Sequence, residues 1–231
     1  DLFWFVGRWV GDGWITTCNG KARVVLCCAR QERVEVDGKL RQAGLMPCWS
    51  EERTTARAVV TRTLLARWLK QNFGISAAHK TIPVWLLSHP LRGAFLEGYL
   101  SADGSQNDKG EMRVTTVSKK LAIGVRLLAQ TVGYNASMYY YKIQPYTIIE
   151  GRRVSQLPQW QVVLRTRSRS AFRDEGMIWG CVRSVEVEAD ERIVYDLTVE
   201  SSHSFLADGI VVHNCQDLSL AGRRKGLAGE R

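Results

Sequence analysis

Two Asp-Gly pairs, at positions 12–13 and 103–104, are the residues whose type and spacing best predict chemistry in this sequence. Each pair ends a segment in which apolar residues recur at helical spacing. A carboxylate at the C-terminal end of a helix is opposed by the helix dipole by roughly 0.3 to 1 kcal/mol, so helix stability does not explain the pattern. If Asp12 and Asp103 meet, their charges repel unless a divalent cation and phosphate groups balance them. The pattern therefore predicts a site for a divalent metal and a phosphate-bearing substrate.

The elements that must position these carboxylates are two helices that pack closely against each other. Small residues four positions apart leave a strip of each helix almost free of side chains, where a second backbone can approach. These small residues are Gly7 and Gly11 in the first segment, and Gly98 and Ala102 in the second. We expect the helices to lie side by side with Asp12 and Asp103 at the same end. We also expect Gly104 to adopt the left-handed conformation that is common after a helix.

Both segments resemble the paired helices of LAGLIDADG homing endonucleases, in the sequences VGRWVGDG (residues 6–13) and LEGYLSADG (residues 96–104). The resemblance implies an α+β fold for residues 1–175, in which two pseudo-symmetric αββαββα halves, about 1–90 and 91–175, form a saddle. It also implies a monomeric enzyme that binds double-stranded DNA. Asp12 and Asp103 would then be catalytic residues that bind Mg²⁺ and drive hydrolysis of one phosphodiester on each strand. The alternative is that both segments are helices that end in ordinary turns.

Local patterns predict the same order of elements twice. In the first half, two strands are joined by an Asn19-Gly20 hairpin turn, and the helix that follows is weak because Asp37-Gly38 interrupts it. The elements expected in the first half are strands 14–18 and 22–28, helix 31–44, a strand pair over about 47–63 and helix 64–72. Those expected in the second half are strand 112–117, helix 118–132, and strands 136–142 and 159–167.

Strand alternation predicts which sheet face meets DNA. Val162 and Leu164 lie on one face of their strand and basic or polar residues lie on the other. Thr55, Thr61 and Thr63 are expected on the same face as their arginine neighbours. Such a face is either simply solvated or faces a polyanion, and rows of one charge on both halves favour the polyanion. The candidate DNA-binding residues are Lys21, Arg23, Arg53, Arg57, Arg113, Gln161, Arg165, Arg167 and Arg169.

One lysine precedes the second helix in the sequence His79-Lys80-Thr81-Ile82-Pro83. This run resembles the block between the two motifs of intein-borne endonucleases. The resemblance implies that Lys80 is catalytic and lies near the scissile phosphates, where it stabilises charge or orients water. The alternative is a surface lysine. Lys142 is a possible counterpart in the second half.

The chemistry changes in residues 176–214. The sequence from 194 to 215, VYDLTVESSHSFLADGIVVHNC, resembles the C-terminal splicing blocks of inteins and implies the C-terminal strands of a Hint domain. The side-chain nitrogen of Asn214 can attack its own carbonyl, form a succinimide and break the bond to Cys215, provided that proton donors and acceptors assist. His213 could polarise that carbonyl and His203 could assist the nitrogen. Cys215 could accept an acyl group, and Asp196 is implicated by the resemblance alone.

Residues 215–231, CQDLSLAGRRKGLAGER, resemble the catalytic segment of DNA cytosine-5 methyltransferases. The resemblance implies a C-terminal extein fragment in which Cys215 serves first in splicing and then in the host enzyme. We expect the chain to be a fragment that begins inside the first helix of the pair. The first splicing nucleophile would then lie in a missing N-terminal segment, which splicing would require.

Composition agrees with a DNA-binding first domain. Residues 1–175 carry 26 Lys and Arg against 14 Asp and Glu, a net charge of +12, whereas residues 176–214 carry −5. No apolar run is long enough to span a bilayer, and six cysteines without CxxC spacing favour a reducing cytoplasm without structural zinc. We therefore expect an intein-encoded homing endonuclease joined to a splicing segment. The alternatives are a DNA-binding protein that has lost cleavage and a purely self-processing fragment.

Overall fold

The computed structural model describes residues 2–149, 151–167, 171–174, 177–182, 184–186, 197, 199 and 201–213. The chain divides into two compact units, residues 1–181 and 182–231, and each is described by itself. In the described part of the chain, no helix has the length and apolar character needed to cross a membrane.

The first half of unit 1 confirms the predicted order of elements. Asn19 and Gly20 both have positive φ, 50° and 71°, as a tight Asn-Gly hairpin turn requires. The second helix continues through Gly38, because Val36 and Leu40 on either side of it are buried. The elements are α1 (Leu2–Asp12), β1 (Gly13–Cys18), β2 (Lys21–Ala29), a 3₁₀ turn η1 (Arg30–Glu32), α2 (Arg33–Gln42), β3 (Cys48–Glu51), β4 (Thr55–Val60) and α3 (Thr63–Phe73).

The second half repeats this order with two differences. A hairpin, β8 (Tyr146–Ile149) and β9 (Arg152–Ser155), is inserted between two strands of the sheet. After the last sheet strand, the described residues form the hairpin β11 (Ala171–Asp174) and β12 (Met177–Gly180), where a third helix was expected. The other elements are η2 (Val84–Ser88), α4 (Arg92–Asp103), β5 (Ser105–Gln106), β6 (Met112–Thr116), α5 (Lys119–Val132), β7 (Asn135–Tyr141) and β10 (Gln159–Arg165).

Two antiparallel sheets share one topology, which confirms the α+β fold with pseudo-symmetric halves. Their strand orders are β1-β2-β4-β3 and β5-β6-β10-β7, so β5, β6, β7 and β10 correspond to β1, β2, β3 and β4. One face of each sheet is apolar and packs against helices, α2 and α3 on the first sheet and α5 on the second. The buried side chains on these faces include Val24, Leu26, Ala56, Ala58, Val114, Val162 and Leu164.

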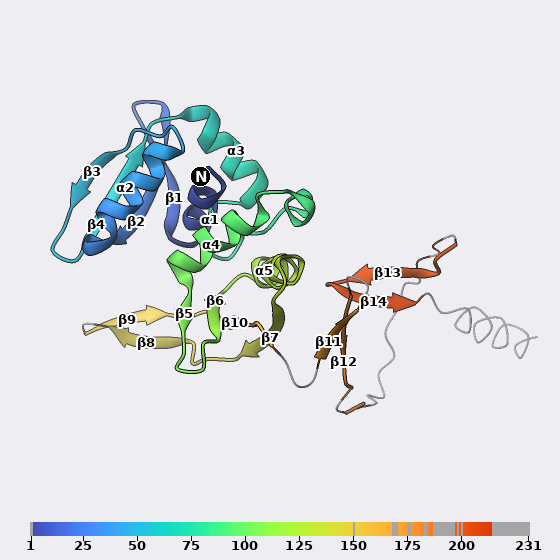
Figure 1. The fold of residues 1–231 in the computed structure, drawn as a ribbon. Coiled ribbons are helices and arrows are strands. Elements are labelled where there is room, and N and C mark those ends of the chain that lie inside the picture. Colours follow the sequence, from blue (N-terminus) through green and yellow to red (C-terminus); the bar gives the residue numbers. More distant parts are fainter. Residues whose placement is uncertain are drawn as a thin grey trace, which may run out of the picture. The chain divides into compact units, whose positions relative to one another are not determined.

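The helices α1 and α4 lie side by side between the two sheets (Figure 1). A Cβ on Gly7 would lie 1.9 Å from the carbonyl oxygen of Phe95, and a Cβ on Gly98 would lie 1.9 Å from the carbonyl oxygen of Trp4. A Cβ on Gly11 would lie 2.4 Å from that of Ala102. These reciprocal contacts confirm the predicted small-residue strip, because only residues without a large side chain allow the two backbones to come this close.

In unit 2, the described residues form one hairpin, β13 (Ser204–Ala207) and β14 (Ile210–His213). The strands are joined at Asp208 and Gly209, whose φ angles of 48° and 79° fit a two-residue hairpin turn. These are the last of the C-terminal strands that the sequence predicts.

Candidate functional site

The two aspartates end their helices at the close contact between α1 and α4. A Cβ on Gly11, next to Asp12, would lie 3.3 Å from the carboxyl carbon of Asp103, so the second carboxyl group lies against the end of the first helix. Gly104 has φ −77° and ψ 139°, which corrects the expected left-handed conformation. A glycine is needed there because a Cβ would lie 2.2 Å from the carbonyl oxygen of Leu100, where the chain turns sharply into β5.

Burial raises the pKa values of both carboxyl groups, and the charge of Asp12 adds to the rise at Asp103. The pKa of Asp103 is raised to about 6, first because its surroundings exclude water and second because Asp12 is close. The pKa of Asp12 is also raised, chiefly by burial and against the opposing effect of Arg8. Two carboxylates that are costly to ionise together favour a bound cation, which would remove the repulsion.

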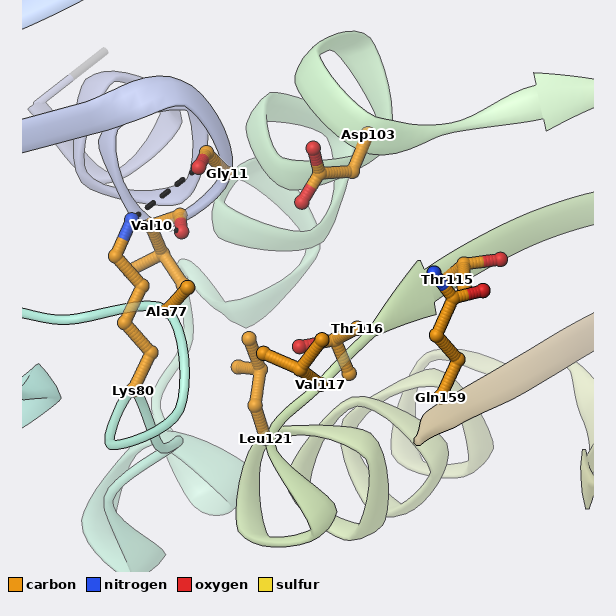
Figure 2. A pocket seen from close by; sticks show the side chains of 10 residues that line it. All are labelled: Val10, Gly11, Ala77, Lys80, Asp103, Thr115, Thr116, Val117, Leu121 and Gln159. Carbon is orange, nitrogen blue, oxygen red and sulfur yellow. Dashed lines mark hydrogen bonds between the residues drawn. The ribbon is translucent and has the colours of Figure 1, made fainter. Parts of the chain in front are cut away.

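A pocket of about 230 Å³ opens beside Asp103. Figure 2 shows the Asp103 carboxyl group on one side of the pocket and the Lys80 side chain, whose Nζ reaches the end of α1, on the other. Thr115, Thr116 and Gln159 line the pocket from the strands of the second sheet. The pocket therefore combines a carboxylate, an ammonium group and neutral polar side chains.

Lys80 is buried, with 6% of its surface exposed, so the alternative prediction of a surface lysine is wrong. Its Nζ donates to the carbonyl oxygens of Trp9, Val10, Gly11 and Gly13, at 3.3, 2.6, 3.2 and 3.0 Å. These include carbonyls of the last turn of α1, which lack partners within the helix. Burial lowers the pKa of Lys80 to about 8, and Asp103 and Asp12 oppose that shift, so the side chain is still cationic at neutral pH. Lys80 thus binds the carbonyl end of α1 and also lines the pocket beside Asp103.

Substituting Lys80 with methionine should destabilise the protein, because it leaves several helix-end carbonyls buried without donors. We expect Lys80→Met to lower the free energy of unfolding by about 2 to 4 kcal/mol in urea denaturation. Lys70, an exposed lysine in the last turn of α3, provides the matched control. Lys70→Met should change stability by less than about 0.5 kcal/mol. Equal effects of the two substitutions would contradict the structural role given to Lys80.

The sequence did not predict a buried arginine at the seam, which is the close contact between α1 and α4. Arg8 is 3% exposed; its guanidinium donates to the carbonyl oxygen of Ser101 on α4 and to Glu32, with 2.6 Å between Nη2 and Oε2. The same nitrogen lies 3.8 Å from Asp12. Glu32 also accepts a hydrogen bond from the backbone of Ala29, at 3.1 Å. A lone arginine in an otherwise apolar helix was the available signal, but its carboxylate partner lies 24 positions away.

The residues at the seam fit a divalent cation that is shared with a substrate. The described residues contain no cluster of three or more His, Cys, Asp and Glu side chains that could enclose a metal on their own. Mg²⁺ commonly binds through one or two carboxylates and completes its octahedron with water and substrate phosphates. Asp12 and Asp103 would be those carboxylates if a cation binds here.

The structure places the candidate DNA-binding residues of the first half as follows. Lys21 and Arg23 lie in β2 on the face opposite Val24 and Leu26, and Arg57 is exposed in β4. The alternation expected from Arg53 to Thr63 is wrong beyond the strand, because β4 covers only Thr55–Val60. Arg53 lies in the turn before β4, Thr61 follows the strand and Thr63 begins α3.

In the second half, the alternation is as predicted. Arg113 pairs with Val163 in the register of the sheet, and Thr115 pairs with Gln161, which puts Gln161 and Arg165 on the same face as Arg113. Arg167 is exposed and lies beyond the end of β10, which is shorter than expected. Lys142 is exposed after β7, and Arg169 lies outside the described residues. The Nε atoms of Arg23 and Arg113 have no hydrogen-bond partner in the described part of the chain.

In unit 2, the β13–β14 hairpin brings the two predicted histidines together. The ring centroids of His203 and His213 are 6.2 Å apart, and Ser204 pairs with His213 in the register. Asp196, Asn214 and Cys215 lie outside the described residues. The roles of all five residues therefore stay predictions.

The sequence matches known proteins over most of its length. The family model described as "Intein splicing domain" matches residues 38–214, more than half of the chain. A DNA polymerase of Thermococcus hydrothermalis is 26% identical over 92% of the chain, and the helicase Hel308 of Thermococcus kodakarensis is 26% identical over 95%. The chain spans 15% and 22% of these relatives' lengths.

Two further matches are a protein of another family and a solved structure. The SufBD family protein Rv1461 of Mycobacterium tuberculosis is 25% identical over 71% of the chain, which covers 20% of that protein. The crystal structure of the homing endonuclease I-DmoI in complex with DNA and Mn has 13% identity and a TM-score of 0.48. The alignment covers 71% of this chain and 88% of that one.

Proposed function

The chain belongs to the intein splicing domain family, and we propose that its first unit is a LAGLIDADG homing endonuclease that cuts both strands of a DNA target. The observation that carries the proposal is the approach of Asp12 and Asp103 at a glycine-lined helix crossing. The basic face of each sheet, with a net charge of +12 over residues 1–175, supports double-stranded DNA as the substrate.

The chain's own residues would act on the phosphodiester in the following way. Asp12 and Asp103 hold a divalent cation, proposed to be Mg²⁺, which when bound would acidify water and stabilise charge on the phosphate. Lys80 places a second positive charge beside the same pocket, where it can stabilise the developing negative charge or orient water. Arg8 anchors α1 to α4 and so keeps Asp12 at its position.

The test is a cleavage selection in Mg²⁺ on randomised double-stranded DNA, followed by sequencing of the cut ends. The proposed enzyme should enrich one long target and cut it on both strands. Binding to one target without cutting, even in Mn²⁺, would instead support a DNA-binding protein that has lost cleavage. No enrichment of any sequence would contradict both functions.

We propose that the natural target is the uninterrupted host gene around the Cys215 codon, within a cytosine-5 methyltransferase. The family's relatives occur in a helicase, DNA polymerases and SufBD family proteins, which supports insertion into unrelated hosts. The selected target should match an uninterrupted methyltransferase gene. Its second part should encode Cys215, Gln216 and the residues that follow them. A target unrelated to that sequence would leave the endonuclease proposal intact and would exclude a cytosine-5 methyltransferase gene as the natural target.

The second unit is proposed to cleave after Asn214 during splicing. His203 and His213 lie together at one end of the β13–β14 hairpin, where they would assist proton transfer around the Asn214 carbonyl. In a splicing-competent protein, Asn214→Ala should abolish release of the 17-residue segment 215–231, as seen by mass spectrometry. Asn135→Ala, which changes the same residue type in β7, is the control and should leave release unchanged. Release from the Asn214→Ala protein would contradict cyclisation at this residue.

A further inference from the structure

A carboxylate lies between two arginines on the polar face of the second sheet. Glu111 contacts Arg165 with 2.5 Å between Oε1 and Nε, and it contacts Arg113 with 3.2 Å between Oε2 and Nη2. The side chain of Glu111 is 19% exposed, against 30% for Arg165 and 41% for Arg113. One partly buried anion therefore joins two neighbouring strands, β6 and β10, through two candidate DNA-binding residues.

The β5–β6 turn holds this carboxylate in place. The side-chain oxygen of Asn107 accepts hydrogen bonds from the backbone N–H groups of Lys109 and Glu111, both at 3.0 Å. Its Nδ2 donates to Glu111 Oε2 at 2.9 Å. Gly110 has a φ of 75°, which closes the turn. Because the backbone and the carboxylate of Glu111 are both bound to Asn107, the anion is fixed before any ligand arrives.

This anion changes the electrostatics that the sequence predicted. Two arginines on one sheet face were expected to repel each other until DNA neutralised them. The three hydrogen bonds to Glu111 lower the pKa of its carboxyl group to about 2, so it is ionised at physiological pH and supplies an internal counter-charge. A DNA phosphate that approaches Arg113 or Arg165 must compete with Glu111.

We propose that Glu111 is a specificity-determining residue of the DNA-binding face: it positions Arg113 and Arg165 for base contacts and limits their binding to phosphates of unrelated DNA. The inference rests on the proposed function and names a residue that acts through its two arginine neighbours. Arg165 contacts Glu111 through Nε, and its guanidinium carries further N–H donors on its two terminal nitrogens. Those terminal donors suit the paired acceptors on the major-groove edge of guanine.

Target DNA and unrelated DNA differ in their base edges but not in their phosphates. Phosphates occur in every sequence, so a freely moving arginine adds affinity for all DNA alike and increases its salt dependence. An arginine fixed by a carboxylate loses less conformational freedom on base contact, and it gains less from a phosphate that it must share. Glu111 should therefore weaken non-specific binding and strengthen specific binding.

The first half offers a matched control. Arg57 contacts Glu52 with 2.8 Å between Nη2 and Oε1, but both side chains are exposed, 45% and 58%. Among the described residues, Glu52 contacts one arginine rather than two. Glu111→Gln and Glu52→Gln both remove one negative charge beside a candidate DNA-binding arginine. They differ because the carboxylate of Glu111 is held by Asn107 and shared between two arginines, whereas that of Glu52 is exposed.

The experiment uses the full chain, the duplex selected by the wild-type protein and a shuffled duplex of the same composition. Fluorescence anisotropy at several salt concentrations, with EDTA to prevent cleavage, gives both affinities. Glu111→Gln should tighten binding to the shuffled duplex about fivefold and should increase the salt dependence of that binding by about one phosphate contact. The ratio of the affinity for the selected duplex to that for the shuffled duplex should fall at least about tenfold. Glu52→Gln should change that ratio less than about threefold.

A second comparison tests whether Glu111 acts through the arginines. In an Arg113→Gln/Arg165→Gln background, adding Glu111→Gln should leave the ratio unchanged; an equally large fall would overturn the inference. A ratio changed no more by Glu111→Gln than by Glu52→Gln would overturn it, as would weaker binding to both duplexes, which is the result of local unfolding. If the wild-type protein selects no duplex, the proposed function fails and this inference fails with it.

Discussion

Substituting Asp103 with asparagine should abolish DNA cleavage and make the protein more stable. The change removes one of two charges that the metal requires, so the single-turnover cleavage rate should fall by about 10³-fold or more. Binding to the selected duplex should persist, because the arginine-bearing sheet faces are untouched. Asp12→Asn should cause a comparable loss of cleavage. Asp108, an exposed aspartate in the β5–β6 turn, is the control, and Asp108→Asn should leave cleavage within about twofold of the wild type.

The stability effect follows from the sign of the pKa shift. Folding raises the pKa of Asp103 from 3.8 to about 6, so the folded state binds this proton more tightly than the unfolded state. The stabilising effect of the protonated form is present below pH 4 and is lost as the pH rises through 6. Asp103→Asn should therefore raise the free energy of unfolding at pH 7.5 by roughly 1 to 2 kcal/mol, a value reduced for partial solvent exposure.

Thermal unfolding between pH 4 and pH 8 measures this effect. The stability advantage of Asp103→Asn over the wild type should grow as the pH rises through 6. Added Mg²⁺ should stabilise the wild-type protein and leave the variant unchanged. A variant that is less stable than the wild type at pH 7.5 would contradict the repulsion between the carboxylates.

Substituting Gly98 with alanine should cause the largest loss of stability among conservative changes in unit 1. The new Cβ would lie 1.9 Å from the carbonyl oxygen of Trp4 and 3.0 Å from the backbone nitrogen of Arg8, so α1 and α4 must separate. Backbone atoms cannot move aside as a side chain can. We expect a loss of about 3 kcal/mol or more, which lowers the melting temperature by roughly 6 to 12 °C. Gly7→Ala should behave similarly.

Gly38 provides a control within another helix. A Cβ on Gly38 in α2 would meet no atom within 4 Å, so Gly38→Ala should stabilise the protein by up to about 1 kcal/mol. Calorimetry of both variants measures the difference. Cleavage should fall with Gly98→Ala even at temperatures where it is folded, because the separation of the helices also separates Asp12 from Asp103. Equal melting temperatures for the two variants would contradict the close crossing.

The sequence predicted the seam because its signals are local and repeated. Helical periodicity, glycine spacing and a terminal Asp-Gly pair are each visible within about three turns, and the second copy removes the ambiguity of the first. Strand alternation likewise placed Arg113, Gln161 and Arg165 on one face. That reasoning failed for Thr63, because α3 begins there and alternation has no meaning outside the strand.

The contacts that the sequence did not predict depend on partners that are distant in the chain. Arg8 is buried because Glu32 and a carbonyl of α4 receive its donors, and nothing in α1 identifies either partner. Lys80 lies 67 to 71 positions from the carbonyls it binds. Glu111 pairs with Arg165 across 54 positions. Each of these charged side chains acquires its role only when the fold brings its partners together.

The central claim is that two helix-end carboxylates form one metal site on DNA. The most direct test is anomalous diffraction from crystals of the protein with its selected duplex and Mn²⁺. The account predicts an anomalous peak coordinated by the carboxylates of Asp12 and Asp103 and by a backbone phosphate of the bound duplex. Mn²⁺ bound elsewhere, or a duplex whose phosphates lie away from both aspartates, would contradict it.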